Sequence, residues 1–198
     1  MDGMTNADLN RELADAGAST DYIHLGTLLS PLDALVNGSF SSKPYLNILI
    51  KYLAIDDSNT KEFIARALTE KGNREASRPL LKLFSDPSMS EDNLWAVGNA
   101  LYVIDDKNTY PEIVELCRKR SLGSSRQMLL GTLARAKSEE AYQVLIDCLD
   151  DAAVRGHAIE ALGRFGNPRA IEVLENLEVK KGLYEYKAKQ TALKRLHK

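Results

Sequence analysis

Apolar residues between Val154 and Leu177 recur at the spacing of two short helices. In the first half, steps of three, one and three positions place four of them on one helix face: Ala158, Ala161, Leu162 and Phe165. The second half places four more on one face: Ala170, Ile171, Leu174 and Leu177. Pro168 stands between the two halves and suits the first turn of a helix, where a backbone N–H would have no intrahelical partner. The pattern predicts two helices joined by a tight turn.

The same pattern recurs upstream at shifts of 29, 61 and 94 positions. One leucine anchors each copy, at spacings of 33, 32, 29 and 31 residues: Leu68, Leu101, Leu133, Leu162 and Leu193. A polar turn separates the two helices of each copy: Gly72-Asn73, Asp106–Asn108, Lys137-Ser138 and Gly166-Asn167. A period near 31 residues with two helices per repeat is typical of an α-solenoid, in which neighbouring repeats cover each other's apolar faces. We therefore predict a right-handed all-α superhelix of about four to five short helix pairs.

Residues 1–58 are less regular and are predicted to form an atypical helical cap. We expect helices over Asn6–Ala16, over Asp21–Val36 with an interruption at Ser30-Pro31, and from Lys43-Pro44 to Leu53. The regular repeats then occupy residues 59–177, and a basic half-repeat occupies residues 178–198. Because terminal repeats of a solenoid are expected to be atypical, we predict one domain over residues 1–198.

Residues 154–177 resemble the short HEAT-like repeat of the phycobilin-lyase type. The residues that match its pattern are Val154, Arg155, Ala158, Ala161, Leu162, Gly163, Gly166, Asn167, Pro168, Ala170 and Leu174. The resemblance is strong in this repeat, degenerate in the other three, and covers roughly residues 59–198. It implies an armadillo-like superhelix and, for a small protein of this kind, a role as an adaptor, inhibitor or immunity-type partner. A faint tetratricopeptide pattern around Trp95, Gly98 and Tyr102 lacks the Leu-Gly pair of that family.

The composition is that of an ordinary globular protein, with 44% hydrophobic and 27% charged residues. No apolar run is long enough to cross a membrane, and residues 1–10 lack the apolar region of a signal peptide, so we expect a cytoplasmic protein. The net charge of −2 disfavours a nucleic-acid-binding protein, which usually has a basic excess. Two alternatives stay open: a nucleic-acid-binding or glycosylase-like protein, and a lyase related to the phycobilin lyases.

The residue types that carry catalysis or bind metals do not occur in a recognisable pattern. No histidine stands three or four positions from another histidine or a cysteine, as a zinc site on a helix would need. His157-x-x-Glu160 occurs once, and the repeated His-Glu dipeptides of HEAT-repeat hydroxylases are absent from the sequence. Cys117 and Cys148 are predicted to be small, partly buried apolar side chains. We predict a non-catalytic protein without a cofactor or a metal.

Two aromatic residues depart from the repeat and are the first candidates for binding a partner. Trp95 stands where other repeats have Glu62, Gln127 and Gly156, and Tyr102 stands where they have Thr69, Ala134 and Gly163. The two are seven residues apart, which places them on one helix face. Because Trp and Tyr are enriched at interface hot spots, we predict a patch formed by Trp95, Tyr102 and Leu94. The alternative is that the two rings fill a gap against a neighbouring helix.

Two groups of basic residues are further candidates. Arg118 and Lys119 stand on the second helix of a repeat, whose polar positions carry charges of both signs. Lys194 and Arg195 belong to residues 180–198, which contain seven Lys or Arg and one acid, so the rest of the chain has a net charge of −8. Positive charge suits the end of a helix, so a capping half-repeat is one interpretation and contact with an acidic partner is the other. The predicted function is a monomeric protein–protein interaction module.

Replacing Trp95 with Ala should weaken binding of the partner while the melting temperature changes by only a few degrees, because the other repeats manage without a ring at this position. Affinity measurement and thermal unfolding of the variant test this together. A large loss of stability with unchanged binding would assign Trp95 to packing instead.

Overall fold

The computed structural model describes residues 3–198, and the first two residues of the predicted cap lie outside the described part. The described chain is all-α apart from one short β-hairpin, and it forms two compact units that divide between Asp106 and Lys107. Each unit is described by itself. The predicted single domain over residues 1–198 stays a prediction.

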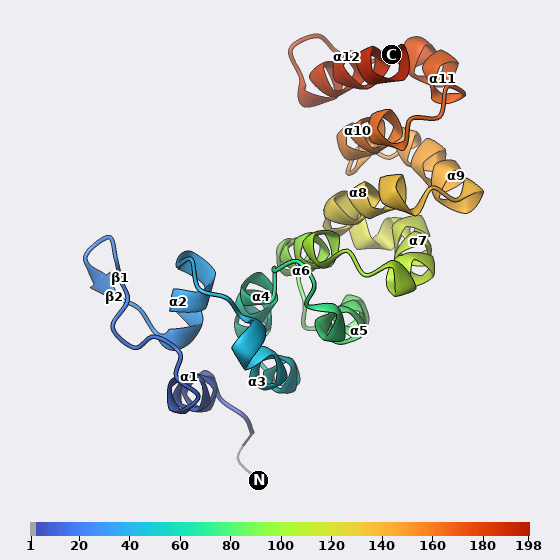
Figure 1. Cartoon of the computed structure of the whole chain (residues 1–198). Coiled ribbons are helices and arrows are strands. Elements are labelled where there is room, and N and C mark those ends of the chain that lie inside the picture. The colour runs from blue at the N-terminus through green and yellow to red at the C-terminus, as the bar shows by residue number, and fades with distance from the viewer. Residues whose placement is uncertain (1–2) are drawn as a thin grey trace. The chain divides into compact units, whose positions relative to one another are not determined.

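The first unit stacks its helices in two layers (Figure 1). One layer contains α2 (Pro31–Asn37), α4 (Ser58–Ala67) and α6 (Glu91–Ile104), and each of these helices contacts the next. The other layer contains α1 (Asn6–Asp15), α3 (Leu46–Tyr52) and α5 (Ser77–Lys82). Short 3₁₀ turns extend α3 and α5: η1 (Lys43–Tyr45), η2 (Arg74–Ala76) and η3 (Leu83–Ser85).

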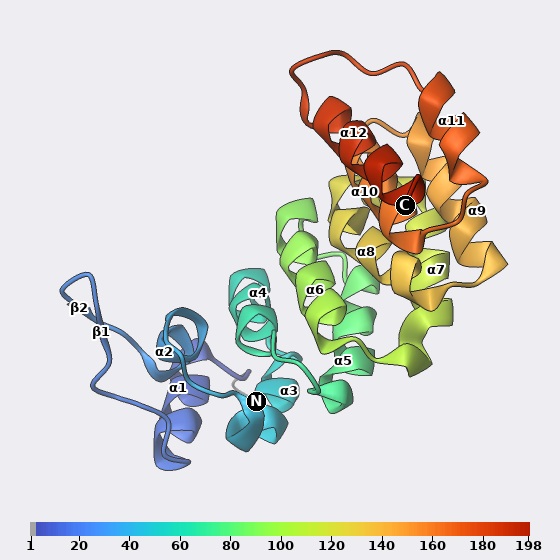
Figure 2. The same cartoon turned by 45° about the horizontal axis from the view of Figure 1, so that its top comes forward.

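The second unit repeats this arrangement (Figure 2). One layer contains α8 (Gln127–Ala136), α10 (Arg155–Phe165) and α12 (Tyr184–Leu196), again with each helix in contact with the next. The other contains α7 (Tyr110–Arg118), α9 (Glu139–Asp147) and α11 (Ala170–Asn176). The 3₁₀ turns are η4 (Lys107–Thr109), η5 (Arg120–Arg126) and η6 (Cys148–Asp150). The predicted all-α solenoid of short helix pairs is thereby confirmed.

The backbone explains why the repeats keep their period. A residue with positive φ follows four positions after the anchor leucine in each of the four repeats: Gly72 at 92°, Asp105 at 59°, Lys137 at 56° and Gly166 at 73°. A left-handed residue ends a helix because it turns the chain out of the helical path. After Gly166, for example, α11 returns against α10. Lys137 and Gly166, which end α8 and α10, lie in the polar turns predicted from the sequence. Asp105, which ends α6, lies one position before its predicted turn, and Gly72 lies in the turn that follows α4.

The N-terminal third differs from the prediction in one segment. Residues 21–30 were expected to be helical, but Ile23–His24 (β1) and Thr27–Leu28 (β2) form an antiparallel hairpin with Ile23 opposite Leu28. Leu25 and Gly26 both have positive φ, at 48° and 81°, as a two-residue hairpin turn requires. The helix begins only at Pro31, where the Ser30 side chain accepts a hydrogen bond from the Asp33 N–H.

The end of the second unit depends on two glycines of α10. A Cβ added at Gly163 would lie 2.7 Å from the Cα and Cβ of Ala192, and one added at Gly156 would lie 2.3 Å from the ring of Tyr184. The missing side chains let α12 approach α10 closely, and Ala188 and Ala192 are buried there. Both residues are small because the space between the two helices admits nothing larger.

We expect Gly163→Ala to lower the free energy of unfolding by about 1–3 kcal/mol, because the added methyl group meets the backbone of α12 and packed cores resist added volume. Gly156→Ala is the matched control and should lose less, because the Tyr184 ring is 46% exposed and can turn aside. Urea unfolding of both variants measures the difference. Equal losses would contradict this account of the α10–α12 contact.

Candidate partner-binding surfaces

The predicted aromatic patch lies on α6 in the first unit. Trp95 and Tyr102 are partly exposed, and both also interact with other residues of the chain. Leu94 is only 6% exposed and belongs to the core, so it offers almost no surface to a partner. The structure thus leaves two of the three predicted residues on the surface, and their role in binding stays a prediction.

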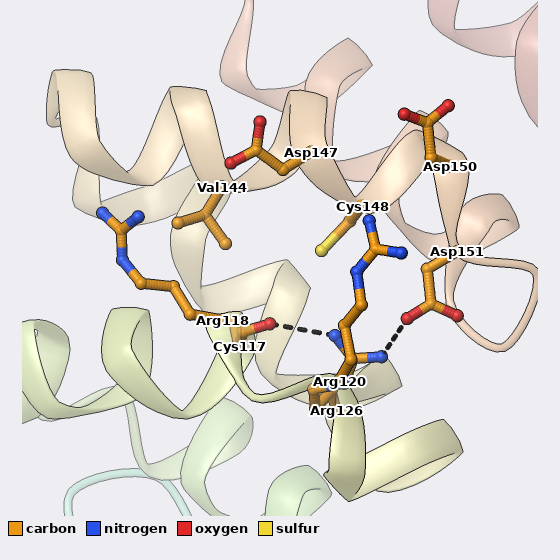
Figure 3. Close-up of a pocket in the computed structure, with 9 residues that line it drawn as sticks. All are labelled: Cys117, Arg118, Arg120, Arg126, Val144, Asp147, Cys148, Asp150 and Asp151. Carbon is orange, nitrogen blue, oxygen red and sulfur yellow. Dashed lines mark hydrogen bonds and ion pairs between the residues drawn. The ribbon is translucent and has the colours of Figure 1, made fainter.

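Arg118 and Lys119 lie at the end of α7 in the second unit, and both are exposed. Arg118 donates a hydrogen bond of 3.2 Å from Nε to Glu115. Arg118 also lines a cavity of about 330 Å³ between the ends of α7 and α9 (Figure 3). The other lining residues are Cys117, Arg120, Arg126, Val144, Asp147, Cys148, Asp150 and Asp151. The charged side chains there are of both signs, so the cavity favours neither a polyanion nor a polycation.

Arg126 links the segments around this cavity by hydrogen bonds. Its side chain is 1% exposed and donates from Nη1 to the Cys117 carbonyl oxygen at 3.0 Å, from Nε to the Gly123 carbonyl oxygen at 3.1 Å, and from Nη2 to the Asp151 carboxylate. Arg155, the equivalent residue of the next repeat, donates to the Leu149 carbonyl oxygen at 2.7 Å. These arginines satisfy carbonyl groups after the second helix of the preceding repeat, which otherwise lack partners. Their role is therefore structural.

The two thiols in the cavity are poor nucleophiles. Burial raises the pKa of Cys117 well above its ordinary value, and burial raises the pKa of Cys148 to about 11. Both cysteines are small apolar residues of the core, more completely buried than predicted, and they form no disulfide. Burial also lowers the pKa of His157, which packs with its ring centre 5.4 Å from that of Tyr184. Residues 3–198 contain no cluster of three or more His, Cys, Asp or Glu side chains that could hold a metal ion.

The predicted basic residues Lys194 and Arg195 lie on the exposed side of α12. Lys189, on the same helix, instead donates to the carbonyl oxygens of Glu175 and Leu177, both at 2.9 Å. It therefore closes the end of α11. The basic segment thus contains both a capping residue and cations that remain on the surface. The three groups of predicted binding residues lie on different helices: α6, the end of α7, and α12.

The most exposed apolar surface of the first unit lies at the hairpin, where no binding residue was predicted. At the hairpin, Ile23 is 63% exposed, Leu25 is 93% exposed and Leu28 is 62% exposed. In both views the hairpin extends away from α1 and α2 (Figures 1 and 2). The available signal was Leu25-Gly26, a possible two-residue turn flanked by His24 and Thr27, but the leucine spacing in this segment also fits a helix.

Residues 111–181 match the family model for HEAT repeats. This segment of the chain consists of HEAT-like repeats. The matched segment runs from α7 to the loop before α12, where the helix pairs follow the repeat most regularly. A comparison with curated proteins gave no match. No helix within residues 3–198 has the length and apolar character needed to cross a membrane.

Replacing Arg126 with Met should lower the free energy of unfolding by about 3–5 kcal/mol, because it leaves a partly buried carboxylate without its partner. Arg155→Met is the control, with an expected loss of about 1 kcal/mol for one carbonyl hydrogen bond. Equal losses for the two variants would contradict the structural role given to the Arg126–Asp151 pair.

The same pair predicts a pH dependence. Burial alone would raise the pKa of Asp151, but hydrogen bonds from Arg126 and from the Ala153 N–H outweigh it and lower the pKa below its ordinary value. A group with a lowered folded-state pKa stabilises the fold above its unfolded pKa, and this contribution disappears as the pH falls through the folded pKa. The difference between wild type and Arg126→Met should therefore shrink below about pH 4, as urea unfolding across pH would show.

Proposed function

We propose that this protein is a non-catalytic protein–protein interaction module, acting as an adaptor, inhibitor or immunity-type partner. HEAT repeats commonly mediate protein association, and the match over residues 111–181 supports this class of function. The raised pKa of both thiols offers no support for a catalytic nucleophile. The observation that carries the proposal is the apolar surface of the hairpin.

The hairpin exposes apolar side chains at a position that the fold does not require. Leu25, at the turn, has a left-handed backbone, which is unfavourable by roughly 1–2 kcal/mol for a residue with a side chain. Ile23 and Leu28 stand opposite each other across the two strands, so they form one apolar face. Burying one such side chain completely is worth about 1.5–3 kcal/mol. Association with another protein would gain this free energy, which folding alone does not.

Contacts at the base of the hairpin hold it in place. Binding through the apolar face would therefore cost little conformational entropy. The Tyr22 ring meets the Phe40 ring edge-on, with their centres 5.3 Å apart, and the Tyr22 hydroxyl donates to the Asn37 carbonyl oxygen at 3.3 Å. Phe40 lies directly against the Cα of Gly38, where an added Cβ would come within 2.5 Å of its ring. A preorganised surface binds more tightly because less conformational entropy is lost.

The loop that carries Phe40 is fixed by one carboxylate. Glu70 accepts hydrogen bonds from the Ser41 hydroxyl at 3.0 Å and the Ser42 N–H at 2.9 Å, and it pairs with Lys43 at 3.1 Å. Burial opposes the charge of Glu70, but these donors outweigh it and lower the pKa of the carboxyl group. The Glu70 carboxylate therefore stays charged near neutral pH and keeps its hydrogen bonds to the loop at the base of the hairpin.

We expect Leu25→Ser to abolish or strongly reduce capture of a specific protein from a lysate of the source organism by the immobilised chain. The leucine contributes little to the fold, so the free energy of unfolding should change by less than about 0.5 kcal/mol. Val173→Ser is the matched control, because Val173 is also an exposed apolar residue, at 37%, and lies on α11 in the other unit. Mass spectrometry of the captured proteins and urea unfolding give the two readouts.

Two results would contradict the proposal. One is equal capture by wild type and Leu25→Ser, which would remove the hairpin from the binding surface. The other is a stability loss in Leu25→Ser large enough to explain the lost capture, which would make Leu25 a structural residue.

A further inference from the structure

We propose that the outer face of α12 binds a short acidic segment of a protein. This inference rests on the proposed function, because it specifies the chemistry of one partner contact. It concerns the second unit, whereas the hairpin belongs to the first.

The outer face of α12 is a row of exposed cations. Lys187 and Lys194 are seven residues apart, which places them on one side of α12, and Lys198 follows just after the helix ends at Leu196. Ala188 and Ala192 are buried on the opposite side, against α10. Gln190 and Thr191, between the lysines, are exposed and uncharged. The lysines therefore point away from the body of the unit.

The positive charges of this row are not neutralised by ion pairs within the part of the chain that the structure describes. The ammonium groups of Lys187 and Lys194 make no ion pair with residues 3–198, in contrast to Lys189, which closes the end of α11. The Arg195 side chain, next to the row, is likewise exposed. Like charges on one helix face repel each other, and an acidic partner would relieve this repulsion.

An acidic protein segment fits this surface better than a nucleic acid does. The ten helical residues from Lys187 to Leu196 span about 15 Å, which matches about five residues of extended peptide. A nucleic-acid site usually neutralises more phosphates over a wider surface.

An apolar residue extends the row at one end. Leu183, the N-cap residue of α12, stands four positions before Lys187 and is 50% exposed. A leucine beside a row of lysines would contact an apolar side chain in an otherwise acidic segment. The structure therefore assigns to this face a segment of about five residues, rich in Asp and Glu and with one apolar residue at its end.

Fluorescence anisotropy with a labelled ten-residue peptide of alternating Glu and Asp, with Leu at one end, tests the proposal. The full chain should bind it at low salt and lose affinity as salt is added. Replacing Lys187, Lys194 and Lys198 with Gln should weaken binding about tenfold, since three exposed ion pairs are lost. Leu183→Ser should weaken it about threefold through lost apolar contact.

The matched control replaces Lys71, Arg74 and Lys82 with Gln. These three residues are also exposed and lie in the first unit, so the change in net charge is identical. We expect less than a twofold effect. Equal losses in the two triple variants would overturn the proposal, because the attraction would then depend only on net charge. No binding of the acidic peptide at low salt, or tighter binding of a single-stranded DNA of ten nucleotides, would also overturn it.

The outcome can be separated from that of the proposed function. If α12 does not bind acidic segments, capture that depends on Leu25 should still occur. If the protein is not an interaction module, the Leu25-dependent capture fails as well.

Discussion

The repeats depend on a left-handed residue that ends the first helix four positions after the anchor leucine, as after Leu101, Leu133 and Leu162. In the second unit, Lys137 and Gly166 end α8 and α10, and the chain then returns so that α9 and α11 pack against these helices. Without this turn the first helix would continue, and its apolar face would have no second helix to cover it. Lys137 adopts the conformation although it carries a side chain, which is unfavourable by roughly 1–2 kcal/mol. Contacts with the next repeat offset part of this: the ammonium group lies 4.9 Å from the centre of the Phe165 ring and 3.1 Å from the Arg164 carbonyl oxygen.

Side chains at equivalent positions link one repeat to the next. Arg126 and Arg155 both reach back to carbonyl groups that follow the preceding second helix. At the end of the array, Lys189 donates in the same way to a carbonyl group after α11, although it does not stand at the equivalent position of the repeat. The repeats are thus joined by polar contacts to the backbone as well as by apolar packing, and this is why charged residues occur inside the array.

The two proposed surfaces lie where the chain departs from the repeat. The hairpin interrupts the helical pattern of the first unit, and α12 has no second helix following it in the described chain. Both expose residues that a repeat would cover. The sequence indicated α12 through its concentration of Lys and Arg. The hairpin was missed because Tyr22, Leu25 and Leu29 have a helical spacing, and two-residue strands are too short to show an alternating pattern.

Periodicity alone determined the helix pairs and the burial of the anchor leucines Leu68, Leu101, Leu133 and Leu162, because each depends on residues a few positions apart. It also indicated that Cys148 would be buried, since that residue occupies a core position of the repeat. Only the tertiary structure decided that Leu94 lies in the core, that Arg126 is buried against Asp151, and that Leu25 is exposed. The burial of these residues depends on whether side chains from other helices cover them. A pattern of residues a few positions apart does not contain that information.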